Sequence, residues 1–206
     1  MLYIYLILGA NLLIIAANLI LSLAFQMFGL DPIYAVILPP ISTVAVIAID
    51  GAVAFVIRRL PEKWFSNESS LSEVSKKECD FYARIGVRKW RTKIPELGMF
   101  TGFHKNRVYE PGSNEYVKRY ILEANYGFVI HIMSIPLGFL IILLCPIQWA
   151  LCFGLPVALV NALLNLLPAA ALRYNIPKLM SLMRMNDRRS ARKSESAPEE
   201  ETVINA

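Results

Sequence analysis

Two apolar blocks alternate with two charged blocks along this chain of 206 residues. Residues 1–57 and 120–172 contain no lysine or arginine, so all 21 basic residues fall in 58–119 and 173–206. Each apolar block has room for two spans of the roughly 20 apolar residues that a bilayer helix requires. The pattern therefore predicts an all-α membrane protein with four transmembrane helices arranged as two hairpins.

Turn-forming residues divide each apolar block. The first block breaks at Gly29-Leu30-Asp31-Pro32 and the second near Cys145-Pro146, because glycine and proline punctuate helices. We expect spans at roughly residues 3–28, 33–57, 123–144 and 148–172.

The charged blocks complete the expected organisation. Between a first hairpin (1–57) and a second hairpin (123–175), the basic segment 58–122 is predicted to be cytoplasmic and interfacial. The remaining residues, 176–206, start basic, turn acidic and contain no aromatic residue. This composition predicts a largely disordered tail.

The placement of lysine and arginine predicts the orientation. With four spans, the N-terminus, the segment 58–122 and the tail lie on one side, and that side holds every basic residue. The positive-inside rule assigns this side to the cytoplasm. We therefore expect a multi-pass plasma-membrane protein with both termini cytoplasmic. Topology accounts for the basic charge, so no nucleic-acid partner is predicted.

The segment from Phe81 to Trp90 mixes aromatic, aliphatic and basic residues. A short basic helix of this kind suits the membrane interface, where Trp90 would lie among lipid headgroups. The alternative is a helix packed on the cytosolic part of the protein. The following stretch, 94–103, is rich in glycine and aromatic residues and favours a re-entrant or surface loop.

Few polar residues fall inside the predicted spans. Asp50 lies in the second span, His131 in the third, and Asn161 and Asn165 in the fourth. The two asparagines are four residues apart and so share a helix face. Ionisable residues within a membrane are costly, which makes each one a candidate for function.

Three of these residues lie at a similar depth in the membrane. Asp50, His131 and Asn165 lie seven or eight residues inside the expected charged ends of their helices, which is roughly 10–12 Å at 1.5 Å per residue. We expect them to face one cavity open to the cytoplasmic leaflet, with Glu123 and Arg173 at its mouth. The alternative is a structural cluster in which the polar groups only hydrogen-bond each other.

Three sequence pieces together carry a family resemblance. They are the run from Arg88 to Gly98, the Glu123-x7-His131 spacing, and Asn165 followed by Arg173-Tyr174-Asn175. Through them the chain from about Phe81 to Met183 resembles the glycosyl-4,4'-diaponeurosporenoate acyltransferases. Tyr126, Phe128 and Ile132 depart from the family pattern, and the first hairpin lies outside the resemblance.

The resemblance implies acylation of a sugar hydroxyl on a membrane-bound glycolipid. The implied donor is an acyl thioester, either acyl-coenzyme A or an acylated carrier protein, with no bound cofactor. A carboxylate beside a histidine also suits general-base catalysis. The candidate catalytic residues are His131, Glu123, Asp50 and Asn165. The candidate substrate-binding residues are Arg173, Tyr174, Asn175, Asn161, Arg88, Trp90, Lys93, Glu96 and His104.

The sequence gives less support to other functions. Three scattered cysteines and two histidines predict neither a metal site nor a disulfide framework. A transporter requires a polar path to the outer side, whereas the helices beyond the polar cluster are nearly all apolar. A non-enzymatic scaffold or accessory subunit, with a structural polar cluster, is the main alternative to the enzyme.

Overall fold

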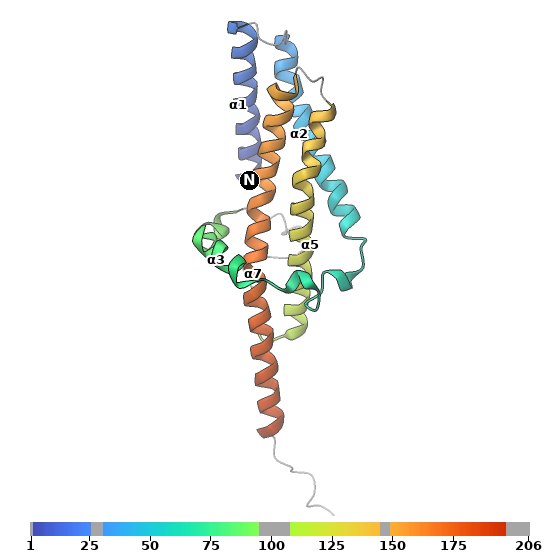
Figure 1. The fold of residues 1–206 in the computed structure, drawn as a ribbon, viewed down its shortest axis with the longest axis vertical. Helices are drawn as coiled ribbons and strands as arrows, with labels where there is room; N and C mark the ends of the chain where they lie inside the picture. Colours follow the sequence, from blue (N-terminus) through green and yellow to red (C-terminus); the bar gives the residue numbers. More distant parts are fainter. Residues whose placement is uncertain (1, 26–30, 95–107, 145–148, 197–206) are drawn as a thin grey trace, which may run out of the picture.

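The computed structural model describes residues 2–25, 31–94, 108–144 and 149–196. Within these ranges every regular element is a helix, and four helices are long and apolar enough to cross a membrane. The predicted all-α class with four membrane-spanning helices is confirmed. Figure 1 shows these helices packed side by side: α1 (Leu2–Phe25), α2 (Pro32–Ile57), α5 (Asn114–Gly138) and α7 (Leu155–Ser196).

Side-chain caps fix the start of three helices. Asp31 accepts a hydrogen bond from the amide of Ile33 at 2.8 Å, with Pro32 as the first residue of α2. Ser75 caps α3 (Lys76–Arg84), and Ser113 caps α5 in the same way. Each cap supplies an acceptor for an amide that has no partner within the helix.

Both α5 and α7 extend beyond the apolar blocks. α5 starts at Asn114, and α7 continues to Ser196 over 42 residues. At 1.5 Å per residue α7 is about 63 Å long, roughly twice the hydrocarbon thickness of a bilayer. The sequence predicted a largely disordered tail from residue 176, whereas the structure shows helix as far as Ser196 (Figure 1).

A hydrophobic core explains why these extensions are helical. At the charged end of the bundle, which is the end where α2 stops and α5 begins, Val117 and Ile121 of α5 pack against Ile176 and Leu179 of α7. All four side chains are buried. This contact lies past the expected boundaries of the spans, so it stabilises a helical pair outside the apolar blocks.

Two glycines let α5 and α7 approach closely. A Cβ atom on Gly138 would lie 2.4 Å from the side-chain amide of Asn161, and one on Gly127 would lie 2.8 Å from Leu172. Small residues at such crossings are typical of packed membrane helices. Gly138 thereby sets the position of Asn161, one of the polar residues singled out above.

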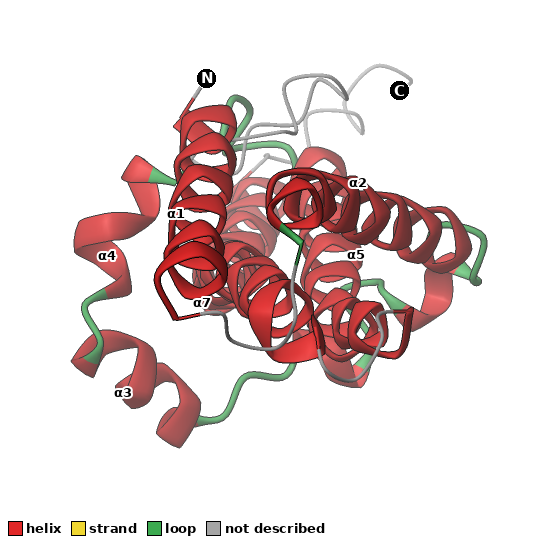
Figure 2. Cartoon of the chain, turned by 90° about the horizontal axis from the view of Figure 1, so that it is seen from above, coloured by secondary structure: helices red, strands yellow, loops and turns green. Residues whose placement is uncertain are grey.

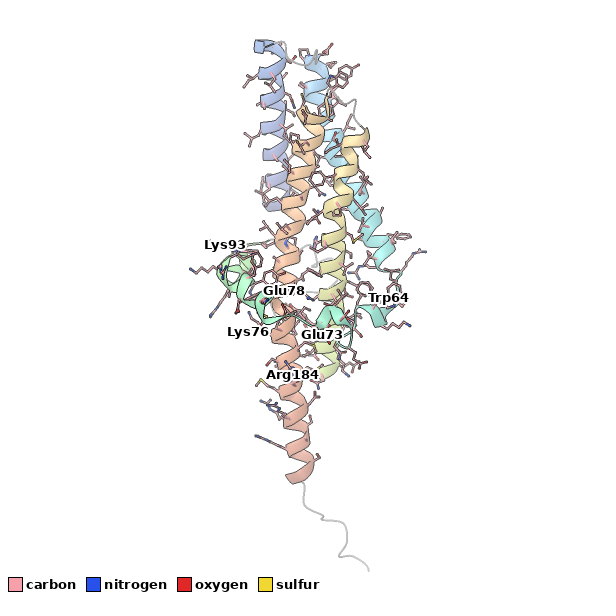
Figure 3. The ribbon with its side chains drawn as sticks, viewed as in Figure 1. Trp64, Glu73, Lys76, Glu78, Lys93 and Arg184 are labelled. Atoms are coloured by element: carbon pink, nitrogen blue, oxygen red, sulfur yellow. The ribbon has the colours of Figure 1, made fainter. Side chains whose placement is uncertain are left out.

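The residues between α2 and α5 run across the charged end of the bundle. They form η2 (Glu62–Trp64), η3 (Ser70–Ser72), α3, α4 (Val87–Trp90) and η4 (Arg91–Lys93). In Figure 2, α3 and α4 lie outside the four long helices. Figure 3 shows Trp64 on one side of the bundle and Glu78 beside α7 on the other.

Residues of α5 hold the start of this connection in place. The Asn125 amide donates to the Phe65 carbonyl at 2.8 Å and to the Ser72 hydroxyl at 2.9 Å. Tyr126 donates to the Leu60 carbonyl at 3.1 Å, and its ring stacks on Phe65. The segment is thus packed on the bundle, and its position at the membrane interface stays a prediction.

Candidate active site

The four long helices enclose a cavity of about 440 Å³. This volume lies within the roughly 300–1,000 Å³ that is typical of small-molecule sites. Most of its lining side chains are aliphatic, while four polar side chains gather toward the charged end. These four are Asp50 of α2, His131 of α5, and Asn161 and Asn165 of α7.

Hydrogen bonds join the four polar side chains. The Asn165 amide nitrogen donates to Asp50 Oδ2 at 3.0 Å, and Asn161 donates to Asp50 Oδ1 at 3.4 Å. On its other side, Asn165 Oδ1 lies 2.8 Å from His131 Nδ1. A chain of contacts therefore runs from the Asp50 carboxylate through the Asn165 amide to the His131 imidazole.

This chain selects the tautomer of His131. The Asn165 amide nitrogen faces acceptors only: Asp50 Oδ2, and the backbone and side-chain oxygens of Asn161 at 3.1 and 3.0 Å. Its oxygen therefore faces His131, and an amide oxygen can only accept. Nδ1 must then carry the proton, so Nε2 of the neutral imidazole has the lone pair. An asparagine that orients a histidine in this way also occurs in papain-like proteases.

The shared depth of three polar residues correctly predicted that they meet in one cavity. Asn161 and Asn165 reach the same carboxylate because they are one helical turn apart. The amide donors of both asparagines compensate the cost of placing a carboxyl group inside a membrane-spanning bundle. The catalytic roles of the four residues stay predictions at this point.

Comparison with known families identifies the protein. A family model described as glycosyl-4,4'-diaponeurosporenoate acyltransferase matches residues 61–185, more than half of the chain. The chain belongs to this family. No curated protein sequence and no solved structure matches the chain significantly.

Family membership confirms the sequence resemblance and places the polar cluster in an acyltransferase. The match contains His131, Asn161 and Asn165 but begins after Asp50. The hairpin that supplies Asp50 and about half of the cavity wall therefore lies outside the matched region. The family membership favours an enzyme over the non-enzymatic scaffold, which the sequence alone left open.

Glu123 of the acyltransferase lies away from the polar cluster. It is eight residues from His131 on α5, about 12 Å along the helix axis. Its carboxylate pairs with Arg58, just after α2, at 2.9 Å. This ion pair joins α5 to the end of α2, so the structure does not bring Glu123 to the imidazole.

Arg173 makes contacts that differ from those expected of a substrate ligand. Its guanidinium donates to the Glu78 carboxylate at 2.7 and 3.3 Å, to the Glu73 carbonyl at 3.0 Å and to the Leu71 carbonyl. The Arg173 guanidinium also lies over the ring of Phe128. These partners occupy most of its five N–H donors. Arg173 thus anchors the segment before α3 to α7.

The same anchor affects Tyr82 of α3. Its hydroxyl donates to Glu78 Oε1 at 3.2 Å. Burial, together with the nearby Glu78 carboxylate, raises the pKa of Tyr82 to about 12. Tyr82 therefore stays protonated at neutral pH and acts as a second donor to Glu78.

We expect Arg173→Met to destabilise the acyltransferase. The change removes the guanidinium that donates to the Glu78 carboxylate and to two carbonyl groups, and each hydrogen bond to a charged group contributes about 1.5–3 kcal/mol. Thermal unfolding in detergent should shift to lower temperature, and proteolysis should cut between residues 66 and 78. Arg184→Met is the control, because Arg184 is exposed further along α7. Equal stability of the two variants would contradict the anchoring role.

The other candidate substrate-binding residues gather on the flank of α7. Arg91 donates to Asn175, and both Arg91 and Lys178 lie over the ring of Tyr174. Trp90 donates to the Ile85 carbonyl at 3.1 Å. Arg88 and Lys93 are exposed beside this cluster. Glu96 and His104 lie outside the described residues.

Sequence reasoning missed three further polar residues of the bundle. Asn11 and Thr43 line the cavity and hydrogen-bond each other at 3.1 and 3.2 Å, which joins α1 to α2. Asn18 donates to the Cys152 carbonyl at 2.9 Å. The signal was available, because Asn11 and Asn18 are seven residues apart and so lie on one face of α1.

Ser134 also joins the candidate site. It lies three residues after His131 on the same face of α5, lines the cavity and is fully buried. Among the described residues its hydroxyl has no hydrogen-bond partner. No group of three metal-ligating side chains occurs in the described part of the chain.

Proposed function

We propose that this acyltransferase moves an acyl group from a thioester donor to a hydroxyl of a lipid-linked acceptor, with His131 as the general base. The acceptor hydroxyl belongs to a sugar, as the family name indicates. One observation carries the proposal: Asp50, Asn165 and His131 form a hydrogen-bonded chain at one end of a mostly aliphatic cavity.

The geometry supports direct transfer. Nε2 of His131 accepts the proton of the acceptor hydroxyl while the hydroxyl oxygen attacks the thioester carbonyl carbon. The tetrahedral intermediate then collapses, the carbon–sulfur bond breaks, and the thiolate takes the proton from the imidazolium. Asn165 and Asp50 hold the ring and support its positive charge, so their role is positioning.

The flank of α7 suits the carrier of the donor. Arg91 and Lys178 lie over Tyr174, and Arg88 and Lys93 near Arg91 in sequence are exposed. Arginine and lysine are the residues that bind phosphate groups. Tyr174 lies nine residues from Asn165, about 13 Å along α7. Coenzyme A or the phosphopantetheine of a carrier protein would place its phosphates here and its thioester near His131.

We further propose that the protein lies in the plasma membrane with both termini and the α3–α4 region in the cytoplasm. In the part of the chain that the structure describes, every basic residue is at the charged end of the bundle or beyond it, as the positive-inside rule requires. Donor thioesters are made in the cytoplasm, so this orientation also gives them access to the site.

Cys79 allows a direct test of this orientation. It is a free, partly exposed cysteine on α3, while Cys152 is buried in the bundle. With Cys145 replaced by serine, a membrane-impermeant maleimide should label Cys79 only after spheroplasts are permeabilised. Cys79→Ser is the control that identifies the labelled site. Labelling of Cys79 in intact spheroplasts would reverse the proposed orientation.

Lipid mass spectrometry tests the proposed reaction. A strain that lacks the protein should accumulate a glycolipid that is lighter by one acyl group, and the wild-type chain should restore the acylated form. The His131→Ala chain should be inserted at the same level and fail to restore it. An unchanged lipid profile in the deletion strain would refute the proposed function.

A further inference from the structure

The cavity extends well beyond the four polar side chains. On α1 its lining runs from Ile4 to Ile14, and on α7 it runs from Asn165 back to Val157. At 1.5 Å per residue these stretches are about 12–15 Å long. At the far end Ile14, Val46 and Val157 belong to one packed apolar cluster. The cavity is therefore a slot with the Asp50–His131 cluster at one end and mostly aliphatic walls beyond it, where the polar lining residues are Ser134 and the mutually hydrogen-bonded Asn11 and Thr43.

One side of this slot is open. Ile4 and Ile47 line it and are 55% and 52% exposed, and Gly51 is exposed as well. Val46 and Val157, which also line the slot, are only 2% and 4% exposed. The opening thus lies between α1 and α2, toward the charged end of the bundle. In a membrane, this part of the surface faces lipid.

We propose that the slot binds the hydrocarbon chain of the transferred acyl group, which enters from the bilayer between α1 and α2. The identification of the bound chain as the transferred acyl chain rests on the proposed function. In that reaction the carbonyl of the acyl group must lie at His131, and the slot continues from His131. A sugar would leave most of its hydroxyl groups without partners, because ten of the eighteen lining residues are aliphatic and Asn11 and Thr43 already hydrogen-bond each other. The acceptor headgroup therefore approaches from the charged end.

The length of the slot limits how much of the chain it holds. An extended chain advances about 1.2 Å per bond, since three backbone bonds of a residue span 3.3–3.6 Å. A slot of about 12–15 Å then holds roughly 10–12 bonds. Carbons beyond this number leave through the open side into lipid.

Gly51 offers a way to close the opening. A Cβ atom at Gly51 meets no atom within 4 Å, so a larger side chain extends into the opening without a clash with the backbone. Gly9 of α1 is a matched control, because a Cβ atom there also meets nothing within 4 Å and Gly9 does not line the slot. Leucine favours the helix over glycine at both sites.

The experiment uses the full chain in phosphatidylglycerol–phosphatidylethanolamine vesicles. The binding probe is a fatty acid with a diazirine near its methyl end, and the transfer assay uses its coenzyme A thioester. Wild-type protein should crosslink on α1 and α2 at the slot. Gly51→Leu should lower both crosslinking and transfer about tenfold, since displacing two methylene groups costs about this much affinity. Gly9→Leu should match the wild type.

The outcomes separate this inference from the proposed function. Equal crosslinking of slot peptides in Gly51→Leu and wild type would overturn the slot. In another outcome, Gly51→Leu loses the crosslinking of slot peptides, and the wild-type protein transfers no acyl group to any acceptor. This outcome would uphold the chain-binding slot and refute the proposed function. Loss of crosslinking in Gly9→Leu as well would also overturn the assignment of the opening.

Discussion

Replacing His131 with alanine should lower the rate of acyl transfer about 10²–10⁴-fold, the usual contribution of a general base. The reason is that Nε2 of His131 has the lone pair in the polar cluster, because Asn165 Oδ1 accepts from Nδ1 at 2.8 Å. Imidazole is also the side chain that most readily exchanges a proton near neutral pH. A transfer assay with a radiolabelled acyl donor measures the loss.

Met133→Ala provides the matched control for this experiment. Met133 lies two residues from His131 on α5 but is 42% exposed on the outer face of the bundle. Both variants should insert and unfold like the wild type, and only His131→Ala should lose transfer. Wild-type rates in purified His131→Ala protein would show that His131 is not the base, and the structural interpretation of the cluster would hold.

Asn165→Leu should have the second largest effect, about 10²-fold, as expected when a catalytic group is misplaced by about 1 Å. Leucine matches the size of asparagine but removes the contact with His131 Nδ1 and the donor to Asp50 Oδ2. The loss should appear in kcat with little change in KM for the donor, because Asn165 positions the base and binds no substrate.

Asn161→Leu is the comparison for this prediction. Asn161 is buried like Asn165 and lies one turn away on the same helix, and its side chain hydrogen-bonds to Asp50 and Asn165. Its substitution should reduce kcat less than Asn165→Leu does. An equal loss in both variants, or a loss confined to KM, would contradict the positioning role of Asn165.

The sequence predicted the membrane-spanning helices because hydropathy acts locally. Stretches without lysine or arginine and of sufficient length must be helical in a bilayer, since their backbone groups find no water there. The convergence of Asp50, His131 and Asn165 was predictable for a related reason. Equal distances from the ends of neighbouring helices place side chains at equal depth, and helical periodicity places Asn161 on the same face as Asn165.

The extensions of α5 and α7 were beyond sequence reasoning because they depend on contacts between distant residues. Charge and low aromatic content favoured a disordered tail after residue 176, but Ile176 and Leu179 pack on Val117 and Ile121 across about 60 residues of chain. Packing of this kind outweighs local composition. Nothing in the sequence near α7 marks where its partner surface lies.

Arg173 shows the same limit for site residues. Its position at the end of the apolar block fits a substrate-binding residue as well as a structural anchor. Its partner Glu78 is 95 residues away in sequence, and two of its acceptors are backbone carbonyl groups. A backbone carbonyl can accept a hydrogen bond from any residue position, so the residue types do not reveal such a contact. Only the fold distinguishes the two roles.

A double-mutant cycle tests whether His131 acts as the base through its contact with Asn165. Residues that act as one unit have non-additive effects on rate. We expect His131→Ala/Asn165→Leu to transfer acyl groups no more slowly than His131→Ala alone, because Asn165 has no base left to position. If the two losses multiply in the double variant, Asn165 acts independently of His131, and it does not position the base.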